Sequence, residues 1–358
     1  MTDAIEATVA VTGMNATDNP APGVAVCRSL RAAPAFQGRI IGLGYEPLDP
    51  GFYAEGLLDG GAILPYPSVG RQATMARLRE LRDQFGINVL LPTLDSELRP
   101  LAGAMAQLAT LGLRALTPSL ESLQAASKSQ LAEEAGRAGF PVPESSPLTT
   151  PEAVSEVVDR LGLPVVIKGV FYGATIAHTE ADAIAAFHFH AAKWGLPVIG
   201  QRFIDGEEYD VAALGDGEGR TIGAVPMRKM ALTDKGKGWS GVTIEDPAMI
   251  GLTEQVVTAL QWRGGLEVEI LKERSAGKLY VAEINPRFPA WVHLTTGAGQ
   301  NLPLACVELA LGRAVDPLPP YRVGVQFVRI SLDQITDMSA YGALSAAGSF
   351  EHPSGSSA

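Results

Sequence analysis

The chain has 358 residues, of which 46% are hydrophobic and 19% are charged, and its formal net charge at pH 7 is −11. This composition predicts a compact protein with more than one subdomain rather than a disordered chain. The acidic balance argues against a nucleic-acid partner, because such a partner requires a basic patch. No apolar run reaches the roughly 18 residues of a membrane span and the N-terminus lacks a signal-peptide pattern, so we expect a cytoplasmic protein without a membrane partner.

The first part of the chain alternates short apolar segments with amphipathic ones. The expected strands are at residues 7–11, 39–43, 89–91 and 115–117, and the expected helices are at residues 24–31, 71–85 and 98–111. This alternation predicts a doubly wound α/β domain. Asp95 and Glu97 follow one of these strands, at the end where open α/β sheets bind ligands, so either could contact a substrate. Capping of the next helix by Asp95 or Ser96 is the interpretation that we favour.

The most informative stretch is 265–291, which predicts a β-hairpin. Its parts are a strand of alternating apolar and acidic residues, a turn and a returning strand, at residues 266–271, 275–278 and 279–284. The pairing would place Glu269 and Glu283 on one face, with Asn285 one pleat further on. Two carboxylates and an amide oxygen are ligands that suit Mg²⁺.

Arg287 lies just beyond Asn285, so its guanidinium can point at the anion that such a metal would bind. A solvated acidic face would explain Glu267 and Glu269 alone, and we assign no ligand role to Glu267. That interpretation explains less well a strand that contains Glu283 and continues as Asn-Pro-Arg.

The order of Glu269 and the segment EINPR at 283–287 resembles the metal-binding end of the ATP-grasp superfamily, in particular the group of carbamoyl phosphate synthetase and biotin carboxylase. The resemblance implies that Glu269, Glu283 and Asn285 hold Mg²⁺ ions on the phosphates of ATP, with Mn²⁺ as an alternative metal. It also implies that Arg287 contacts phosphate.

The resemblance further implies an α/β architecture in which an N-terminal doubly wound preATP-grasp domain precedes an ATP-grasp fold. The expected boundaries are residues 1–118 for the first domain and residues 119–325 for the second. Within the ATP-grasp domain, a small lid at about 140–200 would accompany a larger antiparallel-sheet α+β subdomain. Residues 326–358 would form a C-terminal extension, with a disordered tail from residue 351.

Lys168 ends an apolar strand at 163–169, where a lysine needs either an anionic partner or a route to solvent. The resemblance makes Lys168 the lid lysine that binds phosphate and the adenine side. It makes residues 169–173 the glycine loop that covers the phosphates, since backbone N–H groups of such loops bind phosphate oxygens. This loop contains fewer glycines than the usual version in the family.

Four further residues fit the nucleotide site of the family. Lys128, on an expected helix, matches a lysine that reaches the ATP phosphates, although Ser127 stands where the family has aspartate; a surface lysine is the other interpretation. In a later strand, Gln201 takes the place of the usual glutamate that faces the adenine amino group. The resemblance implies that the backbone of Phe203 contacts the edge of the adenine ring and that Glu208 accepts from the ribose hydroxyls. A strand, a turn and a second strand would produce the same pattern without a ligand.

Arg228 and Lys229 place two cations at a strand end, before a polar loop at 233–240. In the family this region borders the phosphates and the acceptor substrate, so either residue is a candidate for binding a carboxylate or an acyl phosphate. Solvated surface charge explains them equally well. Trp291 and His293 are the candidates for contact with the acceptor.

The resemblance implies an enzyme, an ADP-forming carboxylate–amine ligase. It would activate a small-molecule or peptide carboxylate as an acyl phosphate on Mg-ATP and pass it to an amine or similar nucleophile. A homodimer is compatible with this function. Two alternatives stay open: a bicarbonate-activating carboxylase-type or carbamoyl phosphate-type enzyme, and a catalytically silent ATP-binding protein. Ser127 and the altered loop favour the silent protein, whereas Glu269, Glu283 and Arg287 argue against it.

Overall fold

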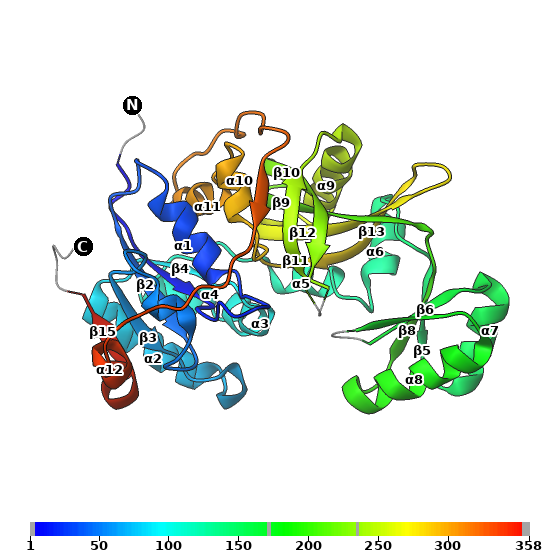
Figure 1. The fold of residues 1–358 in the computed structure, drawn as a ribbon, viewed down its shortest axis with the longest axis horizontal. Coiled ribbons are helices and arrows are strands. Elements are labelled where there is room, and N and C mark those ends of the chain that lie inside the picture. The colour runs from blue at the N-terminus through cyan, green and yellow to red at the C-terminus, as the bar shows by residue number, and fades with distance from the viewer. Residues whose placement is uncertain (1–3, 170–172, 234–235, 353–358) are drawn as a thin grey trace. The chain divides into compact units, whose positions relative to one another are not determined.

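The computed structural model describes residues 4–169, 173–233 and 236–352, and Figure 1 shows their fold. The chain divides into two compact units, each assembled from separate segments. Unit 1 consists of Met1–Glu121, Asp210–Glu267 and Asn285–Ala358, and unit 2 consists of Ser122–Tyr209 and Val268–Ile284. Within the described residues, no helix combines the length and the apolar character that a membrane crossing requires.

Unit 1 contains the parallel sheet that the alternating pattern predicts. Its strand order is β15-β3-β2-β1-β4, and β3, β2, β1 and β4 are parallel to one another. Val9 and Val11 belong to one buried cluster and Ala10 to another, so side chains cover both faces of the sheet. The strands are β1 (Thr8–Thr12), β2 (Arg39–Gly44), β3 (Gly60–Ile63), β4 (Val89–Leu91) and β15 (Ser349–Glu351).

The helices of this part include two short 3₁₀ turns. They are α1 (Gly23–Arg31), η1 (Pro50–Tyr53), η2 (Pro67–Val69), α2 (Arg71–Phe85), α3 (Asp95–Ala102) and α4 (Met105–Thr110). The prediction of one helix at 98–111 is wrong, because the chain leaves the helix at Gly103 and Ala104 and starts again. Pro100 and Gly103 both weaken a helix here, since proline lacks the N–H donor and glycine is a poor helix former.

Two strand predictions also need correction. Residues 115–117 are not a strand; instead Arg114 forms an isolated parallel bridge with Val89. Strand β3 has no counterpart in the prediction, because Gly60 and Gly61 give it little strand propensity.

The C-terminal part of unit 1 contributes a strand to the N-terminal sheet. β15 pairs antiparallel with β3, with Glu351 opposite Gly60, and α12 (Ser339–Ala347) precedes it. Arg39 forms an ion pair with Glu351. The predicted disordered tail is therefore wrong at Glu351, and residues 353–358 lie outside the described residues.

A second sheet has six strands in the order β13-β12-β9-β10-β11-β14. β11 is antiparallel to both β10 and β14, as expected for the larger subdomain. The predicted hairpin at 265–291 is confirmed, since β12 and β13 are neighbours and Glu273 N–H donates to Lys278 O at 2.9 Å. The strands are β9 (Gly206–Asp216), β10 (Thr221–Leu232), β11 (Gly238–Thr243), β12 (Arg263–Glu273), β13 (Leu279–Asn285) and β14 (Gln326–Val328), and the helices of these segments are α9 (Pro247–Ala259), α10 (His293–Gly297) and α11 (Leu302–Ala310).

Unit 2 contains a four-stranded antiparallel sheet of order β5-β8-β6-β7. Its core joins Leu148, Val165 and Val198 of the sheet to the apolar faces of two helices, α7 and α8. Thr150 caps α7 (Pro151–Leu161), since its hydroxyl accepts from Ala153 N–H at 3.3 Å. The elements are β5 (Ser145–Leu148), β6 (Val165–Lys168), β7 (Ala174–Ala177), β8 (Val198–Arg202), α5 (Leu120–Ala125, which spans the boundary between units), α6 (Leu131–Ala138), α7 (Pro151–Leu161) and α8 (Glu180–Trp194).

Candidate functional site

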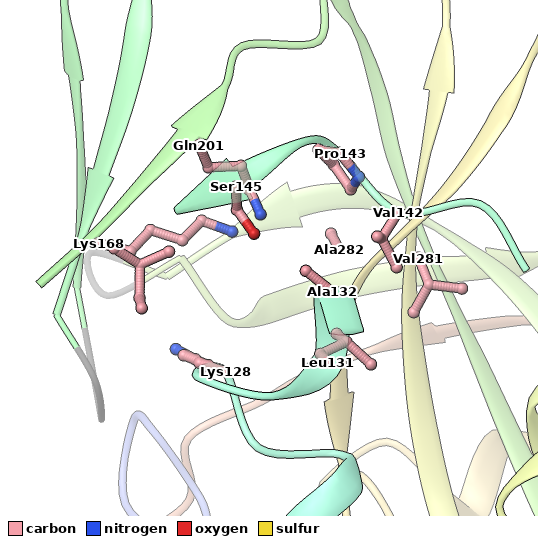
Figure 2. Close-up of a pocket in the computed structure, with 11 residues that line it drawn as sticks. Lys128, Leu131, Ala132, Val142, Pro143, Ser145, Lys168, Gln201, Val281 and Ala282 are labelled. Carbon is pink, nitrogen blue, oxygen red and sulfur yellow. The ribbon is translucent and has the colours of Figure 1, made fainter. Parts of the chain in front are cut away.

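A pocket lies within unit 2, between α6, β13 and the four-stranded sheet. Figure 2 shows the amino groups of Lys128 and Lys168 in the same space, together with the hydroxyl of Ser145 and the amide of Gln201. Mostly apolar walls with a few convergent polar groups are typical of small-molecule sites. The apolar part of the lining is Leu131, Ala132, Val142, Pro143, Ile199, Val281 and Ala282.

Lys168 is mostly buried at the end of β6, where its backbone pairs with Ala174 of β7 and Ile199 of β8. Among the described residues it forms no ion pair. Desolvation lowers its pKa below the ordinary value for a lysine, and carboxylates nearby, first of all Glu283, oppose that shift while Lys128 adds to it. The strand therefore holds a cation in a place where only a bound anion would fully stabilise its charge.

Lys128 forms an ion pair with Glu283, whose Oε2 lies 3.1 Å from its Nζ. The prediction that Lys128 lies on a helix is wrong, because it occupies a turn between α5 and α6. The hydroxyl of Ser127 donates to Gln124 O at 2.6 Å and competes there for a helical carbonyl, which helps to end α5.

The predicted metal ligands of unit 2 are both near Lys168. Glu269 of β12 and Glu283 of β13 are half-buried, and both raise the pKa of Lys168. Glu208 of β9, the predicted ribose ligand, is exposed and acts on Lys168 in the same way. Among the described residues, no three histidine, cysteine, aspartate or glutamate side chains form a metal-binding group, so a metal ion here needs amide or phosphate oxygens as well.

The other residues predicted to bind the nucleotide do not all line the pocket. Gln201 is buried in β8 and lines the pocket, whereas Phe203 and Glu208 are not among its lining residues. The predicted glycine loop falls largely on residues 170–172, which lie outside the described residues. At its base, Gly169 N–H donates to Gly173 O at 3.1 Å.

In unit 1, Glu267 is a buried carboxylate that three donors share. It accepts from Asn285 Nδ2 at 3.1 Å, from Arg287 Nη1 at 3.3 Å and from Trp291 Nε1 at 2.8 Å. Glu267, to which we assign no ligand role, holds Asn285, Arg287 and Trp291 in place through these hydrogen bonds. Its position between Leu266 and Val268 was the signal, since a carboxylate in an apolar strand needs hydrogen-bond donors.

Arg287 also pairs with Asp95, with 3.5 Å between Nε and Oδ2. Asp95 is not the predicted helix cap, because Leu94 is the N-cap residue of α3 and the Glu97 carboxylate accepts from Leu94 N–H at 3.4 Å. Glu97 is buried, and its carboxylate accepts from the hydroxyls of Thr12 and Tyr45, each at 2.5 Å. The structure thus gives Asp95 a contact with a site residue and gives Glu97 a place in the scaffold.

Two further cations of unit 1, Lys237 and Arg329, belong to the same group of charges. Although Lys237 is exposed, desolvation lowers its pKa, and Arg287 and Arg329 lower it further, whereas Glu267 and Asp95 raise it. Arg329 donates through Nε to Gly238 O at 2.8 Å, which fixes it beside the loop that carries Lys237. The sequence singles out neither residue, because no motif indicates that they lie close together in the fold.

The other predicted site residues lie apart from this group or inside the core. Lys229 pairs with buried Asp210, with 3.1 Å between Nζ and Oδ2, whereas its neighbour Arg228 is exposed. His293 Nδ1 lies 3.2 Å from Ser29 Oγ, and burial lowers its pKa. Trp291 is buried and donates to Glu267, as described above.

Comparison with known proteins shows what the chain is similar to. Residues 197–332 match the model of a family described as "ATP-grasp in the biosynthetic pathway with Ter operon". A D-alanine–D-alanine ligase from Chromohalobacter salexigens is 38% identical over 81 residues, which cover 22% of this chain and 26% of that protein. A carbamoyl phosphate synthase large chain from Caldanaerobacter subterraneus subsp. tengcongensis is 25% identical over 219 residues, covering 55% of this chain and 20% of that protein.

The chain therefore matches about a quarter or less of the length of these two curated relatives. Among solved structures, the biotin carboxylase–β-γ-ATP complex from Campylobacter jejuni superposes with a TM-score of 0.68 at 16% identity, covering 90% of this chain and 74% of that chain. This likeness confirms the predicted fold. Together with the family match over residues 197–332 and the curated relatives, it makes the chain similar to ATP-grasp proteins.

Proposed function

We propose that this protein is an ADP-forming ligase that joins a small-molecule or peptide carboxylate to an amine at the expense of ATP. The observation that carries the proposal is Lys168, a mostly buried cation that faces a pocket and forms no ion pair among the described residues. Burial of such a cation costs free energy unless an anion binds beside it. The triphosphate of ATP is an anion that fits this requirement.

The pocket also matches the rest of a nucleotide. Leu131, Ile199 and Val281 offer apolar surface to a flat base, and Lys128 provides a second cation for the phosphates. Gln201 is the candidate for the base edge. Phe203 and Glu208 keep their predicted roles at the ring edge and the ribose.

We assign Mg²⁺ to Glu269 and Glu283, together with Asn285 at the end of β13. The donor set fits, because the ion pair with Lys128 uses only one carboxylate oxygen of Glu283. The hydrogen bond from Asn285 Nδ2 to Glu267 turns the amide oxygen, the metal-ligating atom, to the opposite side. When bound, Mg²⁺ neutralises phosphate oxygens during transfer.

The charged group of unit 1 is our candidate for the substrate carboxylate. Arg287, Lys237 and Arg329 supply three cations, and a guanidinium binds a carboxylate through two parallel hydrogen bonds. Glu267 and Asp95 hold Arg287 from two sides and so fix its direction. Because Lys229 is engaged with Asp210, we propose Lys237 and Arg329 for this role ahead of Arg228 and Lys229.

The chemistry asks the protein mainly for positioning and charge neutralisation. A carboxylate oxygen attacks the γ-phosphorus, and the bond between that phosphorus and the oxygen of ADP breaks. The amine then attacks the acyl carbon of the acyl phosphate, phosphate leaves with the electrons of the C–O bond, and the nitrogen gives up a proton. Arg287 would hold the attacking carboxylate, and Lys128 and Lys168 would hold the phosphates.

The proposal is tested by release of ADP in the presence of Mg²⁺ across a panel of carboxylates, each with and without amines. A carboxylate that releases ADP only together with an amine supports the ligase. ADP release with bicarbonate alone would favour the carboxylase-type alternative. Nucleotide binding is tested separately: Mg-ATP at a hundredfold excess over its Kd should stabilise the fold by about 2.7 kcal/mol, and an unchanged melting temperature contradicts the nucleotide site.

A further inference from the structure

We infer that Gln201 lets the pocket of unit 2 accept a purine with either an amino or an oxo group at its six-position. Inosine triphosphate would then bind nearly as well as ATP. This inference rests on the proposed nucleotide function of the pocket and adds the class of base that it accepts. The relevant groups are the side chains of Gln201 and Ser145, which both line the pocket.

Gln201 is 9% exposed, and its side chain lines the pocket without a hydrogen bond to another described residue. Figure 2 shows its amide directed toward the pocket, on the same side as the hydroxyl of Ser145. An amide that lines a pocket and makes no hydrogen bond within the protein can donate to a ligand or accept from it. Gln201 is therefore a group that a ligand should satisfy.

The backbone around Gln201 is already used within the sheet. β8 lies between β5 and β6, so Gln201 is paired with Ser145 on one side and with Val166 on the other. The next residue, Arg202, donates its N–H to Glu144 O at 2.8 Å. Along this part of β8, the side chain is thus the group that remains to read the edge of a base.

A carboxamide can present either a donor or an acceptor to that edge. Its oxygen accepts from the 6-amino group of adenine, and after a half-turn of the amide its nitrogen donates to the 6-oxo group of hypoxanthine or guanine. The hydroxyl of Ser145 is equally able to donate or accept. A carboxylate at position 201 would accept only, and would therefore repel a 6-oxo base.

The test is equilibrium binding of ATP and of inosine triphosphate to the full-length protein with Mg²⁺, because these bases differ at the six-position and its adjacent ring nitrogen but not at the two-position. For the wild type we expect dissociation constants within about tenfold of each other, the loss that one hydrogen bond to a neutral group can cause. Gln201→Glu should weaken the binding of inosine triphosphate by about tenfold or more relative to the binding of ATP. Gln107→Glu makes the same chemical change on the exposed face of α4 in unit 1 and should leave the ratio unchanged.

A wild-type preference for ATP beyond about tenfold overturns the inference, and this measurement needs no variant. An unchanged ratio in folded Gln201→Glu overturns it as well, and would move base recognition to another group such as the backbone of Phe203. If ATP binds and inosine triphosphate does not, the inference fails while the proposed function stands. If neither binds, the proposed function fails and takes this inference with it.

Discussion

Two lysines show how similar residues in the two units come to differ in use. Lys168 in unit 2 and Lys229 in unit 1 both lie in strands and are both largely shielded from water, and the sequence makes both of them candidates for the site. Lys229 meets buried Asp210 within its own unit, whereas Lys168 meets no ion-pair partner among the described residues and faces a pocket. A lysine paired internally contributes to the fold, and one left facing a cavity is available to a ligand.

The largest effect should come from breaking the internal pair. We expect Lys229→Met to lower the free energy of unfolding by about 3–5 kcal/mol, because Asp210 is 1% exposed and would lose the lysine that faces it. Chemical denaturation measures this change. Arg79→Met removes one exposed cation from α2 in the same unit and should change the stability by less than about 0.5 kcal/mol. A stable Lys229→Met protein would remove the contrast between the two lysines.

Next in size should be the loss of the proposed metal ligand. Glu283→Gln keeps the shape of the side chain but removes one negative charge, so turnover should fall by about a hundredfold, while the half-exposed ion pair with Lys128 costs at most about 1 kcal/mol of stability. Steady-state ADP release and thermal unfolding on the same sample separate the two effects. Equal losses of turnover and stability would make Glu283 a structural residue.

Glu267→Gln offers the matched change two residues before Glu269 on β12. Because the Glu267 carboxylate accepts from Arg287, Asn285 and Trp291, we expect a loss of about 1–3 kcal/mol in stability, together with a lower turnover. Denaturant unfolding and ADP release measure the two quantities. Unchanged stability and unchanged turnover in this variant would show that Glu267 does not hold the site residues in place.

The nucleotide side of the comparison predicts a smaller change. Lys168→Met should weaken the binding of Mg-ATP by roughly tenfold to a hundredfold, since one charge-assisted contact to phosphate is lost. The variant should still fold. Calorimetric titration gives the affinity. Lys193→Met, at an exposed position of α8 in the same unit, is the control that should bind ATP normally. Unchanged affinity in folded Lys168→Met would place Lys168 outside the site.

The smallest effect should be a shift with pH. Desolvation lowers the pKa of Lys168, so this lysine loses its proton at a lower pH than an ordinary lysine, and only the protonated form attracts phosphate. ATP affinity should therefore decline as the pH rises toward that lowered value, and Lys168→Arg should abolish the decline because arginine stays charged. Titrations at a series of alkaline pH values check this. A decline that persists in Lys168→Arg belongs to another group.

The sequence predicts those parts of the site that depend on local pattern. The end of strand β6 at Lys168 and the hairpin that carries Glu269 and Glu283 both follow from the alternation of side chains and from turn residues. The turn around Lys128 does not, because it depends on a side chain-to-backbone bond of Ser127 that competes with the helix.

Contacts between distant segments are beyond such patterns. Asp210 pairs with Lys229 across neighbouring strands, and Glu267 gathers Arg287 and Trp291 from the loop that follows the hairpin. Lys237 and Arg329 come together with them only through the fold of unit 1. No periodicity records which buried carboxylate a given cation will meet, so these roles appear only in three dimensions.

The pairing of β15 with β3 has a consequence for the order in which the chain is made. Residues 60–63 leave the ribosome long before residues 349–351. The outer edge of β3 is therefore unpaired with β15 during most of synthesis. An open strand edge can pair with other chains, and contacts so distant in sequence form slowly. A nascent chain stalled before β15 should therefore need a chaperone, or another cover for this edge, more than the finished protein does.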